Sequence, residues 1–144
     1  MLRLKATLAA GLALGAATFA LAEASDPVVK ARQDAMGMIG ANTKILGQMA
    51  QGQTAFDAAA AQAAFSVISQ KAAEVPSLFE VEADDPESEA KAEIWFMYDD
   101  FVTKSEALKA AADAGLGVDS PEFLGAAMGP LSGSCKACHS EYKM

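Results

Sequence analysis

Two cysteines and a histidine lie close together near the C-terminus, in the order Cys135-Lys136-Ala137-Cys138-His139. Residues three apart lie on one face of a helix, so Cys135 and Cys138 would project their sulfurs side by side. His139 follows within the same turn. Cys-x-x-Cys-His is the attachment pattern of c-type haem, in which both sulfurs form thioethers and the imidazole binds the iron. The motif therefore predicts one covalently attached haem c.

Other kinds of site use part of this pattern. Cys-x-x-Cys also occurs in structural disulfides and in thiol-redox pairs. A thioredoxin-like protein would have a βαβ pattern nearby, and no segment of this chain is a convincing strand. A zinc site needs further ligands, whereas the whole chain holds two cysteines and one histidine. Covalent haem uses all three residues, and we therefore prefer it.

The same residue count limits the other side of the iron. His139 is the only histidine, so a second imidazole from this chain is excluded, and methionine, lysine, water or no ligand remain. Met36 and Met38 lie about 200° apart around a helix and cannot both face one iron. Met36 shares a helix face with Arg32, whose guanidinium would suit a haem propionate. From these residues alone, two alternatives remain: Met36 could be an ordinary core methionine, and Arg32 an ordinary exposed arginine.

The N-terminal segment has the pattern of a secretory signal peptide. A short basic start precedes an uncharged, Ala- and Leu-rich run over residues 6–20, and Ala20-Leu21-Ala22 is a small-residue cleavage site. The apolar run is too short to favour a membrane-spanning helix. Cleavage after Ala22 would leave a single domain, residues 23–144, and cleavage after Ala24 is an alternative. We expect an exported, periplasmic protein with no membrane span after cleavage.

The charge of the remaining chain narrows the class of partner. Without Arg3 and Lys5, the chain keeps 9 of its 11 basic residues and has 19 acidic ones, which gives a formal charge of 9 − 19 = −10. This balance argues against nucleic acid and favours redox partner proteins with basic docking surfaces.

Hydrophobic periodicity predicts four helices with short connections. Asp26-Pro27 and Ser120-Pro121 both have the pattern of an N-cap followed by the first helical residue. We expect an acidic loop over residues 75–89, and a kink or a split of the last helix at Gly129-Pro130. The expected helices run from about Pro27 to Gln51, Thr54 to Ala73, Ser88 to Ala114, and Pro121 to the C-terminal end. They predict an all-α, antiparallel four-helix bundle with haem c on the C-terminal helix.

The chain resembles a known family, the class II c-type cytochromes or cytochrome c′ superfamily. The resemblance is carried by Val29-Lys30-Ala31-Arg32-Gln33, by Glu93-Ile94-Trp95, and by the segment from Ser134 to Tyr142. It covers essentially the whole chain after the signal peptide.

The family has two branches, and the resemblance implies a position for this chain in one of them. High-spin cytochromes c′ have a five-coordinate iron that binds nitric oxide or carbon monoxide. The low-spin branch has a methionine from the first helix as sixth ligand. The fourth residue after the arginine points at the iron, and here it is Met36; Ile39 to Gly47 also looks like the low-spin branch. The resemblance thus implies a one-electron carrier with His139 and Met36 as axial ligands and Arg32 beside the haem, the gas-binding cytochrome c′ being the alternative.

The resemblance also bears on enzyme activity and on assembly. A peroxidase would need a distal acid–base histidine, and the sequence has no second histidine, so we expect no enzyme. Family members often form dimers through their first two helices, and the Ala-rich second helix is compatible with a homodimer.

Overall fold

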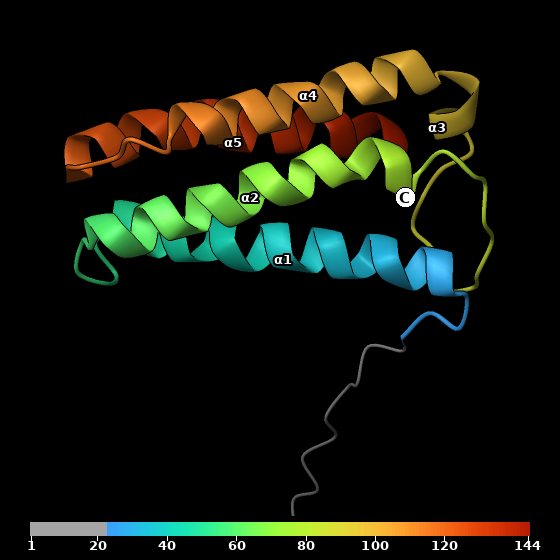
Figure 1. Ribbon diagram of the computed structural model, residues 1–144, viewed down its shortest axis with the longest axis horizontal. Coiled ribbons are helices and arrows are strands. Elements are labelled where there is room, and N and C mark those ends of the chain that lie inside the picture. Colours follow the sequence, from blue (N-terminus) through green and yellow to red (C-terminus); the bar gives the residue numbers. More distant parts are fainter. Residues whose placement is uncertain (1–22) are drawn as a thin grey trace, which may run out of the picture.

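The computed structural model describes residues 23–144 as a bundle of four long helices and one short one (Figure 1). Neighbouring long helices run antiparallel in the order α1, α2, α4 and α5, which confirms the predicted all-α bundle. The helices are α1 (Pro27–Ala50), α2 (Ala58–Leu78), α3 (Glu93–Phe96), α4 (Tyr98–Ala114) and α5 (Pro121–Tyr142). The predicted signal peptide, residues 1–22, lies outside the described residues, so cleavage after Ala22 or Ala24 stays a prediction.

The two predicted N-caps at proline-initiated helices are present. The carboxylate of Asp26 accepts hydrogen bonds from Val28 N at 2.7 Å and Val29 N at 3.1 Å at the start of α1. The hydroxyl of Ser120 accepts one from Phe123 N at 3.3 Å at the start of α5. In both helices the proline occupies the first turn, where its missing N–H leaves no hydrogen bond unmade.

The predicted start of α2 at Thr54 is wrong, because Asp57 is the cap. Asp57 accepts a hydrogen bond from Ala60 N at 2.9 Å. Thr54 N instead donates to Gln48 O at 3.2 Å, as part of the turn after α1. Of two cap-type residues three positions apart, the turn uses the first and the helix uses the second.

The predicted end of α2 near Ala73 is also wrong, because the helix continues through Pro76 to Leu78. A proline inside a helix leaves the carbonyl four residues earlier without a partner, in this case that of Ala72. The buried hydroxyl of Ser105, on α4, donates to Ala72 O at 3.0 Å. A tertiary hydrogen bond thus replaces the missing helical one.

The predicted third helix divides into two and begins later than expected. Residues 89–91 pair with the C-terminal segment instead, since Lys91 N donates to Tyr142 O at 3.0 Å and Met144 N donates to Glu89 O at 2.9 Å. The short helix α3 follows, and Met97, with φ −126° and ψ 44°, separates it from α4. Pairing with residues distant in the sequence overrides local periodicity here.

The predicted split of the last helix is wrong, because α5 runs through Gly129-Pro130 as a single helix. Pro130 and Ala126, four residues earlier, are both exposed. Water can therefore bind the carbonyl that the proline leaves free, and the helix continues.

The bundle is not closed equally on all sides. Helices α1 and α5 contact each other least among the four neighbouring pairs of long helices. Away from this seam the core is closed by fully buried side chains from all four long helices. The largest on those helices are Phe65, Leu46, Ile68, Leu124 and Leu131. The seam between α1 and α5 therefore provides the space for a site.

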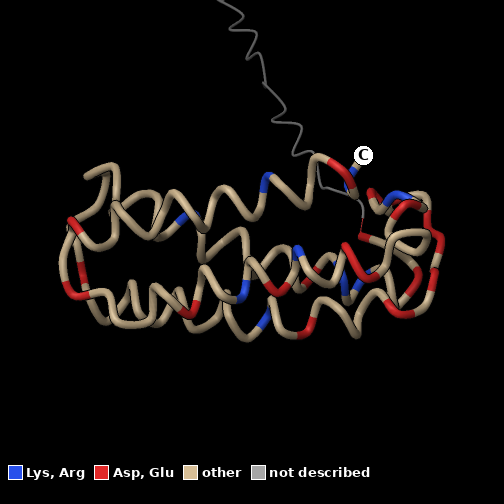
Figure 2. The backbone as a smooth tube through the Cα atoms, turned by 90° about the horizontal axis from the view of Figure 1, so that it is seen from above, with Lys and Arg blue, Asp and Glu red and all other residues tan. Residues whose placement is uncertain are grey.

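Asp85 attaches the acidic segment between α2 and α3 to the start of α1. This buried carboxylate accepts hydrogen bonds at 2.9 Å from Ser25 N, Ser25 Oγ and Asp26 N, and another at 2.9 Å from Glu87 N. Hydrogen bonds from backbone amides lower the pKa of Asp85 from 3.8 to about 2. Most residues of the predicted loop are exposed, as expected, but Asp85 is a buried structural carboxylate. Figure 2 shows many acidic residues at this end of the bundle.

The Asp85→Asn substitution should lower the free energy of unfolding at neutral pH, because an amide cannot accept the same four donors as an anion. The folded-state pKa of Asp85 lies below its unfolded-state value, so its contribution is complete above about pH 4 and is lost as the pH falls toward 2. Urea titrations at several pH values should therefore show the wild type and the variant converging in acid. Asp84→Asn, at the exposed neighbouring position, is the control. A loss of stability that did not depend on pH would contradict this account.

Candidate haem site

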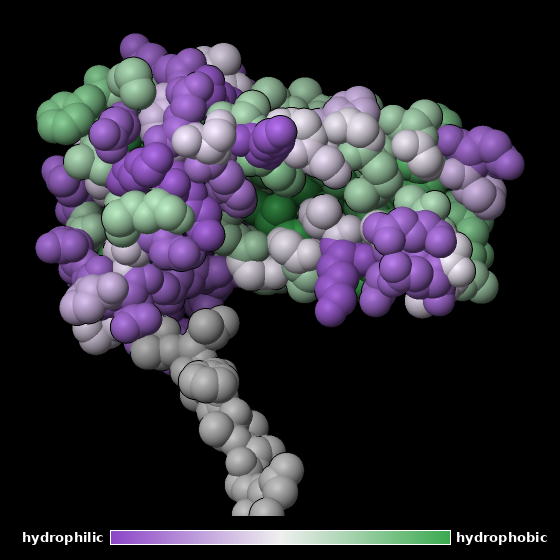
Figure 3. Space-filling model, turned by 180° about the vertical axis from the view of Figure 1, so that it is seen from behind, coloured by the Kyte–Doolittle hydropathy of each residue, from purple (hydrophilic) through white to green (hydrophobic). Residues whose placement is uncertain are grey.

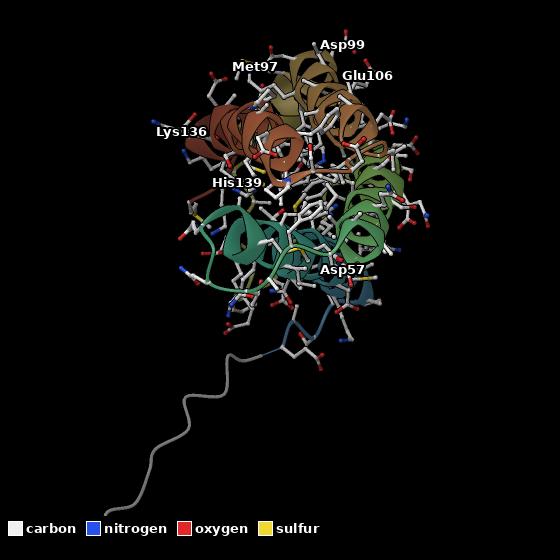
Figure 4. The ribbon with its side chains drawn as sticks, turned by 90° about the vertical axis from the view of Figure 1, so that its left-hand side faces the viewer. Asp57, Met97, Asp99, Glu106, Lys136 and His139 are labelled. Carbon is white, nitrogen blue, oxygen red and sulfur yellow. The ribbon has the colours of Figure 1, made fainter. Side chains whose placement is uncertain are left out.

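The last turns of α5 hold all three residues of the Cys-x-x-Cys-His motif. Cys135 and Cys138 are half-buried free thiols that pack against the hydrophobic core. Figure 4, which looks along the bundle, shows His139 on the side of α5 toward α1, whereas Lys136 points outward. The helix thus directs the two cysteines toward the core, His139 toward α1 and Lys136 to solvent, as the predicted helical spacing requires.

Two adjoining cavities lie along the seam between α1 and α5, and both are lined by Met36, Cys138 and His139. The first also contains Arg32, and the second contains Cys135. All five residues predicted from the sequence therefore meet at one site. Figure 3 shows the face opposite to that of Figure 1, where the surface is hollowed and hydrophobic residues line the hollow.

The remaining walls come from every long helix and from the paired segment 88–90. Aliphatic and aromatic side chains dominate them. In the first cavity these are Val29, Phe79, Ile94, Phe101 and Tyr142, and in the second they are Ile39, Val75 and Leu108. Such a lining suits a flat, largely apolar ligand with few polar groups.

The protonation states of the motif residues argue against a thiol-redox site. Burial raises the pKa of Cys135, and burial is also the main cause that raises the pKa of Cys138 to about 11. Reactive cysteines have the opposite shift, toward the thiolate. Although His139 is exposed, partial burial of its imidazole lowers its pKa, and the Lys143 ammonium acts in the same direction. The neutral imidazole is the form that binds a metal.

Arg32 is buried beneath the acidic segment, with 3% of its surface exposed. Its Nε donates to Leu78 O at 2.9 Å and its Nη2 donates to Val81 O. The guanidinium carbon lies 4.6 Å from the ring centre of Phe79 and 5.3 Å from that of Trp95. The reading of Arg32 as an ordinary exposed arginine is therefore wrong.

One atom of this guanidinium has no partner. Among the described residues that are not exposed, Arg32 Nη1 is the one buried side-chain nitrogen or oxygen without a hydrogen bond. Burial lowers the pKa of Arg32, but arginine stays charged at neutral pH. Leaving a charged donor unpaired in the interior is costly, and Arg32 lines the first cavity, so this residue fits an anionic ligand group there. Apolar walls, two adjacent thiols, a neutral imidazole and this donor together fit a haem with its propionates.

A polar cluster beside the motif was not predicted from the sequence. The hydroxyl of Tyr142 donates to Asp100 on α4 at 2.5 Å, and Lys104 pairs with the same carboxylate at 3.0 Å. The hydrogen bond from Tyr142 is the main cause that lowers the pKa of Asp100. The spacing of Asp100 and Lys104 predicts their helical ion pair, but the contact with Tyr142 depends on how α4 and α5 approach each other.

The sequence profile of the family described as Cytochrome C′ matches residues 27–143. The chain belongs to the cytochrome c′ family. Cytochrome c-556 of Agrobacterium fabrum is 35% identical over 118 residues, which cover 81% of this chain and 80% of that protein. Cytochrome c′ of Cereibacter sphaeroides is 35% identical over 132 residues, or 87% and 88% of the two chains. A solved nitric oxide complex of a cytochrome c prime variant from Alcaligenes xylosoxidans has 32% identity and a TM-score of 0.65, and the match covers 81% and 93%.

Family membership confirms haem c as the cofactor and an electron carrier as the general class of protein. The two relatives named c-556 and c′ have the same identity with this chain, so identity does not assign it to either branch. Across residues 23–144, none of the helices combines the length and the apolar character needed to cross a membrane.

Replacing Arg32 with lysine should destabilise the protein by about 1–3 kcal/mol, the usual cost of leaving a buried polar group unsatisfied. A lysine ammonium cannot reproduce the fork that reaches Leu78 O and Val81 O together. Urea denaturation of the holoprotein measures the change, with Lys44→Arg at an exposed position of α1 as the control. Equal stability of Arg32→Lys and the wild type would contradict the structural role assigned to Arg32.

Proposed function

We propose that this protein is a low-spin, periplasmic one-electron carrier whose haem c is attached through Cys135 and Cys138 and ligated by His139 and Met36. The observation that carries the proposal is that Met36 on α1 and His139 on α5 line the same two cavities. When bound, haem c supplies a reversible one-electron couple. The residues around it determine how the group is held and which oxidation state is favoured.

The two cysteines provide the covalent attachment. Each thiol would supply the sulfur of one thioether bond to the haem. Cys135 and Cys138 lie on the inner face of α5 and pack against the core, which holds both sulfurs in the seam.

The axial pair combines a nitrogen donor with a soft sulfur donor. His139 offers a neutral imidazole, since its pKa is lowered. Met36 is half-buried on α1 and packs against the core, so its thioether approaches from the helix facing α5. Thioether ligation raises the reduction potential of a haem. Retaining two protein ligands in both oxidation states keeps the geometry nearly constant and favours fast electron exchange.

Arg32 would hold a propionate through Nη1, its unpaired donor. Its other two hydrogen bonds already fix the guanidinium against the carbonyls of Leu78 and Val81. The group is therefore oriented in advance, and little side-chain entropy is lost when the anion binds.

The second candidate function is a high-spin cytochrome c′ that binds nitric oxide or carbon monoxide. The observation that favours it is the nitric oxide complex of the relative from Alcaligenes xylosoxidans. In this case Met36 would pack beside the iron as part of the core and would not bind it. Both functions use the same attachment residues, so the role of Met36 separates them.

Compartment, partners and assembly follow from the same proposal. The signal-peptide pattern of residues 1–22 supports export to the periplasm, where redox proteins would be the partners. A homodimer of the kind common in the family stays a prediction. We propose no enzymatic activity. His139 is the only histidine and is assigned to the iron, so none is left to serve as the distal acid–base group of a peroxidase.

The Met36→Ala substitution tests the sixth ligand. It should abolish the sharp low-spin α and β bands of the reduced protein and allow carbon monoxide to shift the spectrum. Met38→Ala is the matched control, because Met38 is an exposed methionine two residues away on the same helix. A Met36→Ala protein that kept the low-spin bands of the wild type would contradict methionine ligation by this residue.

Single and double cysteine variants test the attachment. Cys135→Ala and Cys138→Ala should each retain one thioether, with a shifted α band of the reduced pyridine complex, and the double variant should lose its haem to acidic acetone. Ser134→Ala, on the preceding helical position, should behave as the wild type. Haem that stayed bound to the double variant after acid extraction would contradict the assignment.

A further inference from the structure

One end of the bundle presents apolar side chains to solvent. Three large apolar residues are more than half exposed within residues 23–144, and all three lie at this end: Phe96 (84%), Met144 (72%) and Val81 (68%). The other exposed large apolar residues of this part of the chain do not exceed 44%. Exposed aromatic and methionine side chains are typical of the centre of a protein–protein interface.

Hydrogen bonds and ring contacts place the three segments at the same end. Met144 N donates to Glu89 O at 2.9 Å, so the C-terminal residue lies against the segment before α3. Val81 O accepts from Arg32, whose guanidinium also lies over the ring of Trp95, the residue before Phe96. Ile94 of α3 is buried and Trp95 half-buried, whereas Phe96 is left outside.

Acidic residues are concentrated at the same end of the bundle (Figure 2). Six exposed carboxylates of this end make no ion pair with any other described residue. They are Glu80, Glu82, Asp84, Glu87, Glu93 and Asp99. Two of them flank Val81 in the sequence. We name the three apolar residues and these six carboxylates the acidic end surface. Figure 4 shows Met97 and Asp99 of the same region on the outer side of the bundle.

The charge decides which class of partner suits this surface. A second copy of the chain meeting it face to face would bring two sets of six carboxylates together, and anionic lipid would be repelled in the same way. A protein with basic residues around an apolar centre is complementary in both charge and hydrophobicity.

The acidic end surface is also close to the proposed site, on which this inference rests. Glu89 and Ala90 form part of the wall of the first cavity, and they belong to the same short segment as Glu87. Arg32 lies between the cavity and the carbonyl of Val81. A partner on this surface would thus lie a short distance from the cavity.

We propose that the acidic end surface is the docking site for a basic redox protein, with Phe96 as its apolar anchor. The partner contacts Phe96, Val81 and Met144 through an apolar patch and pairs its surrounding lysines with the six carboxylates. The carboxylates accelerate association at low salt, and the apolar contacts determine how long the complex lasts.

The test is calorimetric titration of the oxidised holoprotein with oxidised mitochondrial cytochrome c, a basic protein used here as the probe, at low ionic strength. Phe96→Ala should weaken binding about tenfold, as is typical for an aromatic anchor. Glu80→Gln/Glu82→Gln should weaken it by about tenfold and reduce its dependence on salt.

Matched controls lie at exposed positions of other helices, away from the acidic end surface. Phe123→Ala replaces an exposed phenylalanine at the start of α5, and Glu106→Gln/Glu122→Gln removes two exposed carboxylates that make no ion pair among the described residues. Both should bind the probe as the wild type does. Equal losses in test and control variants, or no saturable binding by the wild type, would overturn the proposal.

Two further readouts separate this proposal from its rivals. If Phe96→Ala converted a dimer to a monomer in light scattering, the surface would be a self-interface and the proposal would be wrong. Binding measured by heat requires no electron transfer, and haem content is measured separately by absorption. A failure of the docking proposal therefore differs from a failure of the haem ligation assigned above.

Discussion

The structure depends on keeping α1 and α5 apart while the other helix pairs close. Residues of both helices line the two cavities, and the aliphatic and aromatic walls of that space would be poorly packed if nothing filled it. A flat apolar cofactor replaces the missing helix contacts with contacts of its own. Because anything that binds only the folded state stabilises it, haem attachment and folding of this bundle are expected to be coupled.

Arg32 connects that seam to the rest of the molecule. Its guanidinium is buried, lies over two aromatic rings, and fixes two carbonyls at and just beyond the end of α2. The residue also lines the first cavity, and its remaining nitrogen, Nη1, has no partner. One residue can thereby couple the charge state of the site to the acidic segment, whose outer side carries the exposed carboxylates.

The sequence was sufficient to predict the number of long helices, two of their caps and all five residues that meet at the site. These features depend on local spacing and on side-chain chemistry, both of which a sequence contains directly. Cys135 and Cys138 share one face of α5, and Arg32 and Met36 share one face of α1. A four-helix bundle that turns these two faces inward brings the residues together.

Several of the features that could not be predicted depend on contacts between distant segments. The hydroxyl of Ser105 allows α2 to continue past Pro76, and the C-terminal residues pair with residues 89–91 and prevent a helix there. The burial of Arg32 depends on carbonyls some 46 and 49 residues away. Local propensity gives no information about such partners, and tertiary contacts override it.

Ligation of the haem iron by both Met36 and His139 is the property on which the proposed function depends. The most direct measurement is the absorption spectrum of the purified wild-type protein, oxidised and reduced, with and without carbon monoxide. If both residues are ligands, we expect sharp, split α and β bands on reduction and little response to carbon monoxide. Broad high-spin bands that shift when carbon monoxide is added would contradict this ligation and would support the gas-binding function.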